Sequence, residues 1–456
     1  MELINIKELS RDKKFIKRVI TIAIPIAFQN LLNTILNLAD NIMIGALGES
    51  AIAGVGLANR VFFVLTLLLF GIVSGSSILT AQYYGKRDIK NIRRVLGVSL
   101  FLGLLGSLIF LLGGLFIPKI VMRIFTPNEG TIEIGASYLR IVALSYPITA
   151  VTNSYIAVLR ATNKVKAPVF ITIISIFVNI IFNYTFIYGK FGAAAMGVRG
   201  AALATLIARI VEASLILYVV YRKECEARAK INELVDVNKE FIKKYFITVS
   251  PVIANEFMWG LGVTIYSLVY GRMGDDAVAS ITITQNVEQI CFVLLQGLSA
   301  ATGVILGNEL GANKLKKAEK HSEYIFTIQI ILVGILAVFC LIIRKPLINL
   351  FTVSEQVAYN IKNCLNVFVI YLPFRSFNLV NIVGVLRCGG DTKAALFLDI
   401  SGVWLVGIPM AFLGGILLNL PIYYVYAMIT FEEFYKFILG RRRYNKKLWV
   451  RNIVGA

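Results

Sequence analysis

Long apolar stretches run the whole length of the chain, and short polar breaks separate them. A helix needs about 20 mainly apolar residues to cross the hydrocarbon core of a bilayer. Apolar length and turn residues predict such helices near residues 19–44, 52–80, 95–118, 133–160, 166–189, 196–221, 245–270, 276–308, 322–343, 357–386, 394–415 and 418–439. The pattern therefore predicts an all-α integral membrane protein with twelve transmembrane helices.

The composition agrees with a membrane protein. The 456 residues are 57% hydrophobic and only 16% charged, whereas soluble proteins are about 45–50% apolar and about 25% charged. The first apolar stretch, 19–44, is too long for the core of a signal peptide, and no small-residue cleavage site follows it. We therefore expect it to be a true span and not a cleavable leader.

The basic residues indicate which loops face the cytoplasm. The chain has 46 lysines and arginines and a net charge of +20. If both termini are cytoplasmic, 34 of these residues fall on predicted inside segments and only seven on predicted outside loops. Cytoplasmic loops of membrane proteins carry such an excess, and this rule accounts for the charge without a nucleic-acid partner. Both termini are expected in the cytoplasm.

The two halves of the chain resemble each other at an offset of 226 residues. At this offset Pro25 aligns with Pro251 and Gly45 with Gly271. Because each half has six spans, both insert in the same orientation, as a parallel repeat. The repeat predicts two pseudo-symmetric six-helix lobes around a central cavity, an arrangement common in carriers. The predicted parts are an N-terminal lobe (1–221), a cytoplasmic linker (222–244) and a C-terminal lobe (245–456).

The first span carries a polar stripe. Asn30, Asn33, Asn37 and Asp40 follow one another at spacings of three or four, which places them on one face of a helix. A carboxylate inside a membrane is costly and is a functional candidate by default. We predict that Asp40 binds a cation or a proton and that Asn33 and Asn37 line the substrate cavity. The alternative is an amide ladder that joins helices.

Other polar groups of the first half lie on spans five and six. Asn179 and Asn183 are one turn apart, and Thr205 follows a run of small residues that allows close helix packing. Together with Asp40 they offer the hard oxygen ligands of a sodium site, although hydrogen bonding between helices explains the asparagine pair equally well. Arg209 and Glu212 are three residues apart and predict a local ion pair.

The second half has different polar candidates. Glu256 lies on span seven, and Gln285 and Glu288 share a face of span eight. Glu288 is expected either to bind a cationic substrate or to pair with Arg375. Trp259 and Tyr266, the residue that aligns with Asp40 in the repeat, are candidates for stacking on flat cations, although most aromatic residues in membrane helices serve packing.

Several stretches resemble the multidrug and toxic compound extrusion (MATE) transporters. They are Ala39-Asp-Asn-Ile-Met-Ile-Gly45, the end of span two from Gly75 to Gly85, and the stretch from Asn179 to Thr205. The resemblance covers essentially the whole chain. It implies an antiporter of the bacterial cytoplasmic (inner) membrane that expels organic cations by means of a sodium or proton gradient, with no cofactor besides the coupling ion.

The resemblance also assigns roles to individual residues. Asp40 matches the essential aspartate of span one, Asn179 and Asn183 match the polar pair of span five, and Thr205 matches a hydroxyl of span six. One branch of the family has aspartate where this chain has Asn183, so the chain looks closest to the NorM-type branch. The span-seven glutamate of several members lies where this chain has Trp259, so Glu256 is either a shifted equivalent or unrelated.

Other functions are less consistent with these residues. A related flippase for a lipid-linked oligosaccharide or another lipid is the alternative, but such carriers tend to have basic cavities. An enzyme is not expected, because His321 is the only histidine and the five cysteines show no metal-ligand spacing. The expected partners are the lipid bilayer and small lipophilic or cationic substrates. Because one chain holds both lobes, we expect it to function as a monomer.

Overall fold

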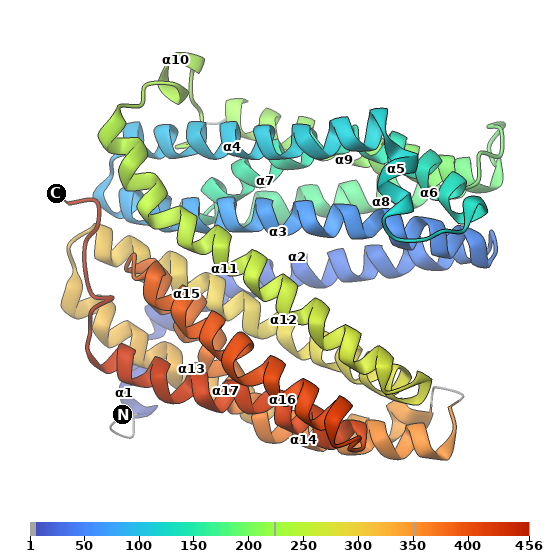
Figure 1. The fold of residues 1–456 in the computed structure, drawn as a ribbon. Helices are drawn as coiled ribbons and strands as arrows, with labels where there is room; N and C mark the ends of the chain where they lie inside the picture. Colours follow the sequence, from blue (N-terminus) through green and yellow to red (C-terminus); the bar gives the residue numbers. More distant parts are fainter. Residues whose placement is uncertain (1–5, 223–224, 350–352, 456) are drawn as a thin grey trace. The chain divides into compact units, whose positions relative to one another are not determined.

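The computed structural model describes residues 6–222, 225–349 and 353–455, which form helices and no β-strand (Figure 1). Residues 1–5 of the expected cytoplasmic N-terminus and residues 223–224 of the predicted linker lie outside this range. The helices in the first half are α1 (Ile6–Arg11), α2 (Lys13–Gly45), α3 (Glu49–Lys86), α4 (Ile89–Phe116), α5 (Pro118–Arg123), α6 (Glu129–Val142), α7 (Ser145–Ala161), α8 (Lys166–Tyr188) and α9 (Val198–Arg222).

The second half continues the same pattern after a short helix in the linker. Its helices are α10 (Ile231–Leu234), α11 (Lys239–Arg272), α12 (Asp275–Gly311), α13 (Leu315–Asn349), α14 (Glu355–Asn378), α15 (Thr392–Ile400), α16 (Ile408–Phe412) and α17 (Ile422–Asn445). Three π-helical segments, η1 (Leu379–Leu386), η2 (Ser401–Gly407) and η3 (Leu413–Leu417), extend or connect helices α14 to α16. Each of the twelve predicted spans coincides with one helix or with one run of consecutive helices.

Ten helices of the described chain are long and apolar enough to cross a membrane. Helices α6 and α7, which meet at a bend of 48°, are long and apolar enough only when taken together, and they would make an eleventh span if they cross the membrane as one unit. The remaining predicted span corresponds to α17, which is less apolar because it contains Glu432, Glu433 and Lys436. The all-α membrane fold predicted from the sequence is therefore confirmed.

Local sequence explains where several helices begin and end. Asp88 caps α4, since its side chain accepts a hydrogen bond from the backbone N–H of Asn91. Ser354 caps α14 in the same way, through Val357. Helix α8 ends at Gly189, whose φ of +67° is the left-handed conformation that glycine adopts without strain. These signals correspond to the polar breaks that separate the predicted spans.

The helices form two compact units. One unit comprises Met1–Ala27, Ala81–Arg87 and Ser250–Ala456, and the other comprises Phe28–Thr80 and Asp88–Val249. We call them the C-terminal unit and the N-terminal unit. These two units differ from the lobes (1–221 and 245–456) and linker (222–244) predicted from the sequence repeat. The predicted lobes describe the duplication of the sequence and stay a prediction. The units instead divide α2, α3 and α11 along their lengths.

Close packing on α12 explains why the first part of α2 belongs to the C-terminal unit. Gly297 of α12 lies so near α2 that a Cβ atom would fall 2.6 Å from the Ala23 carbonyl oxygen. Further along α12, Gly311 lies directly against Gln82, at the end of α3. Residues without a Cβ atom let backbones approach closely, so these helix ends join the C-terminal unit.

Candidate functional site

Asp40, Asn183 and Asn179 form a hydrogen-bonded chain in the N-terminal unit. Asn183 donates from Nδ2 to Oδ1 of Asp40 at 2.6 Å and to Oδ1 of Asn179 at 2.8 Å. Asp40 lies near the end of α2, and the two asparagines lie one turn apart on α8. Near the same ends, the Tyr188 hydroxyl donates to the Met43 carbonyl at 3.0 Å. The structure thus brings together three of the predicted coupling residues.

Thr205 completes this group from α9. Asn179 donates from Nδ2 to the Thr205 hydroxyl at 3.4 Å. Helix α9 can approach α8 this closely because Gly200 has no side chain: a Cβ atom there would lie 2.5 Å from the Phe186 carbonyl oxygen. Ala201, Ala202 and Ala204 are buried as well. The small-residue run therefore positions Thr205 against the asparagine pair.

The group presents oxygen atoms that a cation could bind. Asn179 and Asn183 are buried, with 2% and 1% of their surface exposed, whereas Asp40 is only half-buried. The buried Oδ1 atom of Asn183 has no hydrogen-bond partner among the described residues. Carboxylate and amide oxygens are ligands for hard cations, and a carboxylate also accepts a proton. The arrangement is therefore chemically suited to bind a cation such as sodium or to accept a proton.

The other asparagines of the predicted stripe lie differently. Asn33 and Asn37 are exposed, although both precede Asp40 on the same helix. They take no part in the hydrogen bonds that join Asp40 to α8 and α9. Their assignment to the substrate cavity stays a prediction.

A second polar chain leads away from this group through the N-terminal unit. The predicted pair of Arg209 and Glu212 is present, with Nη1 and Oε2 2.7 Å apart. Glu212 also accepts from the Thr172 hydroxyl at 3.2 Å, and Thr172 accepts from Gln29 at 2.8 Å. Gln29 in turn accepts from Arg160 at 2.6 Å. The roles of Thr172, Gln29 and Arg160 were not visible in the sequence, because their partners are far away along the chain.

In the C-terminal unit Glu256 forms a buried ion pair. Its carboxylate lies 3.0 Å from Nη2 of Arg387, and both side chains are buried. The neighbouring Asn255 donates to Asp399, also at 3.0 Å. Glu256 is therefore already neutralised by a cation from the chain itself.

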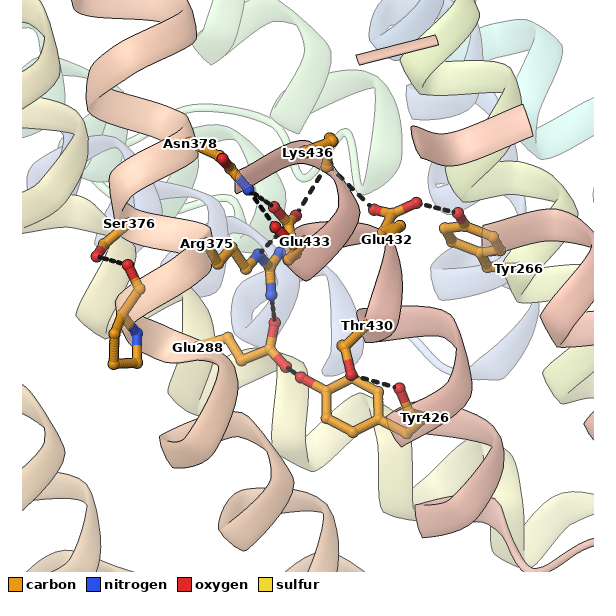
Figure 2. A network of polar contacts seen from close by, with 11 residues as sticks. Tyr266, Glu288, Arg375, Ser376, Asn378, Tyr426, Thr430, Glu432, Glu433 and Lys436 are labelled. Atoms are coloured by element: carbon orange, nitrogen blue, oxygen red, sulfur yellow. Dashed lines mark hydrogen bonds and ion pairs between the residues drawn. The ribbon is translucent and has the colours of Figure 1, made fainter. Parts of the chain in front are cut away.

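Glu288 pairs with Arg375, one of its two predicted alternatives. Its Oε2 atom lies 2.6 Å from Nη1 of Arg375, and its other oxygen accepts a hydrogen bond from the Tyr426 hydroxyl (Figure 2). The Arg375 guanidinium also stacks over the ring of Phe292, 4.4 Å from its centroid. These contacts join α12, α14 and α17.

The network continues along α17 through charges that the sequence interpretation overlooked. Lys436 lies 3.3 Å from Glu432 and 3.0 Å from Glu433, and Tyr266 donates to Glu432 at 2.6 Å (Figure 2). Asn378 donates to Glu433 at 2.8 Å. Three charged residues within one predicted span were the signal that could have revealed this network, because buried charges need partners.

Two glycines of η2 make room for these side chains. A Cβ atom on Gly402 would lie 2.6 Å from Cγ of Lys436, and one on Gly407 would collide with the Tyr266 hydroxyl and with Glu432. Glycine inside a helix often marks such a close approach. Trp259 and Gln285, by contrast, are exposed, and their predicted contacts with substrate stay predictions.

The helices and the polar groups within them define an integral membrane transporter. The sequence profile of the MatE family matches residues 25–185 and 251–413, which is more than half of the chain. The chain therefore belongs to the MATE family of transporters, which are not enzymes, and it is related to NorM. The two matches begin 226 residues apart, at the offset of the predicted repeat.

Individual relatives agree with this assignment. The chain is 24% identical over 440 residues to the uncharacterized transporter YisQ of Bacillus subtilis, covering 96% of both chains. It is 27% identical over 402 residues to the probable multidrug resistance protein NorM of Thermotoga maritima, covering 87% of this chain and 85% of the relative. A MOP-superfamily transporter from Pyrococcus furiosus has the same fold, with a TM-score of 0.84, 22% identity and coverage of 94% of this chain and 96% of that one.

Proposed function

We propose that this transporter is a secondary antiporter that exports organic cations in exchange for sodium ions or protons. The group formed by Asp40, Asn183, Asn179 and Thr205 is the observation that supports the proposal. The group joins an intramembrane carboxylate to buried amides. Placing a carboxylate inside a membrane costs free energy, so a packing contact between helices is a poor explanation for it. The relatives named probable multidrug resistance proteins support a drug-like substrate.

The proposed mechanism is competition for one negative charge. A coupling ion that enters from outside binds at Asp40 and neutralises it, and this favours release of the cationic substrate. After the transporter has reoriented, the ion leaves toward the cytoplasm and a new substrate can enter. A carboxylate in a medium of low dielectric constant stabilises one positive charge and strongly disfavours a second, so the two cations exclude each other.

Two coupling ions fit the same residues. A proton would reside on the Asp40 carboxyl itself. A sodium ion would take oxygens from Asp40, Asn183 and Asn179, which include the unpartnered Oδ1 atom of Asn183. In both cases the ion is a transported substrate, and no cofactor is required.

Transport in vesicles tests the proposal. Purified protein is reconstituted with a fluorescent lipophilic cation inside, and a sodium gradient and a proton gradient are imposed separately. We expect one gradient to drive efflux, and D40N to abolish it while the protein still folds. Glu49→Gln, which neutralises an exposed carboxylate at the start of α3, is the matched control and should transport normally. Efflux retained in D40N would remove Asp40 from the mechanism.

A lipid flippase is the second candidate. For the Pyrococcus furiosus transporter of the same fold, a binding pocket of reverse polarity suggests a different function. In this chain the partly exposed Arg375, stacked on Phe292, is a group that could attract an anionic substrate. Failure of both gradients to move any cation, together with movement of a fluorescent anionic lipid in the same vesicles, would favour the flippase.

We further propose that the protein resides in the bacterial cytoplasmic membrane as a functional monomer with both termini in the cytoplasm. The distribution of lysine and arginine between the loops supports this orientation. Fusions that place alkaline phosphatase or a green fluorescent protein at the C-terminus test it. Fluorescence without phosphatase activity is expected, and the reverse would contradict the orientation.

A further inference from the structure

The end of α2 in the N-terminal unit is attached to α8 by a second hydrogen bond, beyond the one at Asp40. The Tyr188 hydroxyl donates to the backbone carbonyl of Met43 at 3.0 Å. Met43 lies three residues after Asp40 on α2, about 4.5 Å further along the helix axis. Tyr188 is the last residue of α8 and follows Asn183 by five residues. The two helices are therefore joined at two levels, first through the Asp40 carboxylate and then through a peptide carbonyl.

The Met43 carbonyl belongs to the groups that a helix end leaves without a partner in its own helix. Helix α2 ends at Gly45, and the last four carbonyls of an α-helix have no N–H partner within it. The carbonyls of Ile44 and Gly45 accept backbone hydrogen bonds from the turn that follows. The Met43 carbonyl accepts from Tyr188 instead. Helix α8 thus caps the end of α2 with a side chain.

Packing holds the Tyr188 side chain in place. Tyr188 and Met43 are partly buried and pack against a hydrophobic cluster of the N-terminal unit that includes Ile44 and Ile187. The Tyr188 ring also meets the ring of Tyr184, one turn earlier on α8, edge to face with centroids 5.7 Å apart. Tyr184 is 45% exposed, and its hydroxyl makes no hydrogen bond with a described residue. Of these two tyrosines, Tyr188 is therefore the one whose hydroxyl joins α8 to α2.

The two contacts between α2 and α8 respond differently to an ion. A proton or a sodium ion at Asp40 neutralises the carboxylate, and a hydrogen bond to a neutral group is weaker than one to a charged group. The bond from Asn183 to Asp40 therefore weakens when an ion binds. The Met43 carbonyl has no charge to lose, so its bond with Tyr188 keeps its strength in both states of the site.

We propose that Tyr188 is a positioning residue of the ion site: its bond to Met43 keeps the last turns of α2 against α8, so that Asp40 stays beside Asn183 whether or not an ion is bound. This role rests on the proposed antiport function. Tyr188 acts through the backbone of α2 and is not itself an ion ligand. It sets the distance between the carboxylate and the amide oxygens, on which the affinity for the coupling ion depends.

Removal of one hydroxyl tests this role in the reconstituted vesicles. Tyr188→Phe keeps the ring, so the protein should fold and its maximal rate of efflux should change little. If sodium is the coupling ion, its half-saturating concentration, measured with choline as the replacement at constant ionic strength, should rise about threefold or more, because its ligands are held less closely together. If protons are the coupling ion, the half-saturating proton concentration should fall, because a looser bond from Asn183 stabilises the ionised carboxylate less. Tyr184→Phe, the matched control, should behave like the parent protein.

Two further measurements distinguish positioning from a general effect on stability. Where sodium is the coupling ion, it should raise the unfolding temperature of detergent-purified Tyr188→Phe less than that of the parent protein. For either ion, Tyr188→Phe should shift the ion dependence of Asn183→Ala much less than that of the parent protein, because the contact through which Tyr188 acts is absent. A merely structural hydroxyl would lower the unfolding temperature equally with and without the ion and would leave the ion dependence unchanged, and that result would overturn the proposal.

The outcome for the parent protein separates this inference from the proposed function. Ion-driven efflux in the parent protein, with the same ion dependence in Tyr188→Phe and Tyr184→Phe, contradicts the role of Tyr188 alone. Absence of any effect of sodium or pH on the parent protein contradicts the antiport function itself, and the role of Tyr188 with it.

Discussion

The side-chain amide of Asn183 donates a hydrogen bond from Nδ2 to Asp40 at 2.6 Å, while its side-chain oxygen, Oδ1, has no hydrogen-bond partner among the described residues. The amide thus uses its donor to hold the carboxylate and keeps an acceptor oxygen beside it. Because Nδ2 also reaches Asn179, both asparagines have a defined orientation. Hydrogen bonds that fix the orientation of these side chains reduce the conformational entropy that is lost when an ion binds.

The first prediction concerns Asn183. Replacement by alanine removes the hydrogen bond to the carboxylate and one cation ligand, and a hydrogen bond to a charged group contributes about 1.5–3 kcal/mol. If the coupling ion is sodium, which loses a ligand, we expect its half-saturating concentration to rise about tenfold or more. If it is a proton, the half-saturating proton concentration should fall instead, because the lost hydrogen bond stabilised the ionised carboxylate. Thr185→Ala on the same helix, where the hydroxyl bonds only its own helix backbone and is exposed, is the control. An unchanged ion dependence in N183A would exclude this amide as a ligand.

The second prediction concerns the approach of α9 to α8. Gly200→Ala places a Cβ atom 2.5 Å from the Phe186 carbonyl oxygen and forces the helices apart. Such overpacking costs about 1–3 kcal/mol, and Thr205 should move away from Asn179. Thermal unfolding and ion-driven transport should both be impaired. Gly56→Ala is the control, since nothing lies within 4 Å of its added methyl group; equal losses in both variants would contradict the packing argument.

The third prediction concerns the charged network of the C-terminal unit. Lys436→Met leaves Glu432 and Glu433 buried without their shared cation, and breaking a buried pair in this way costs about 3–5 kcal/mol. We expect a clear drop in the unfolding temperature of the detergent-purified protein. Arg441→Met, on the same helix but exposed, should leave it unchanged. A variant K436M as stable as the parent protein would show that the two glutamates find another partner.

The fourth prediction concerns the linker between the two halves. Asp236 lies 2.8 Å from Arg94 and 3.1 Å from Lys90, and the hydrogen bond from Arg94 lowers the pKa of Asp236 below its ordinary value. Since the folded pKa is lowered, the contact stabilises docking at neutral pH and is lost as the pH falls through that lowered pKa. Hydrogen-exchange protection of residues 229–238 should decrease as the pH falls below about 4, the ordinary pKa of aspartate.

Substitution of the acid should reproduce that loss at neutral pH. Asp236→Asn is expected to speed cleavage by trypsin after Arg228 and Lys230, whereas Asp275→Asn, an exposed acid at the start of α12, should not. Because the ion pairs are exposed, the effect on global stability should be small. Identical cleavage rates in D236N and the parent protein would show that other contacts hold the linker against α4.

Interactions within one helix could be predicted from the sequence. The pair of Arg209 and Glu212 follows from a spacing of three residues, because a helix places such neighbours on one face. The pair of Glu288 and Arg375 could only be named as one of two alternatives, since the two residues lie 87 positions apart on different helices. The cluster of Glu432, Glu433 and Lys436 was visible in the sequence as three charges in one span, but its partner Tyr266 was not.

The sequence by itself determined the all-α membrane fold, because the thickness of the bilayer and the cost of unpaired backbone groups leave little freedom to an apolar stretch of about 20 residues. It also determined the family, through the order of its motifs. Only the tertiary structure decided which polar side chains meet. Asp40 and Asn183 are 143 residues apart, and their contact depends on how α2 packs against α8. The contact of Asn179 with Thr205 depends on how closely Gly200 lets α9 pack against α8. Such packing is a property of helix surfaces in three dimensions, which hydrophobic periodicity along the chain does not record.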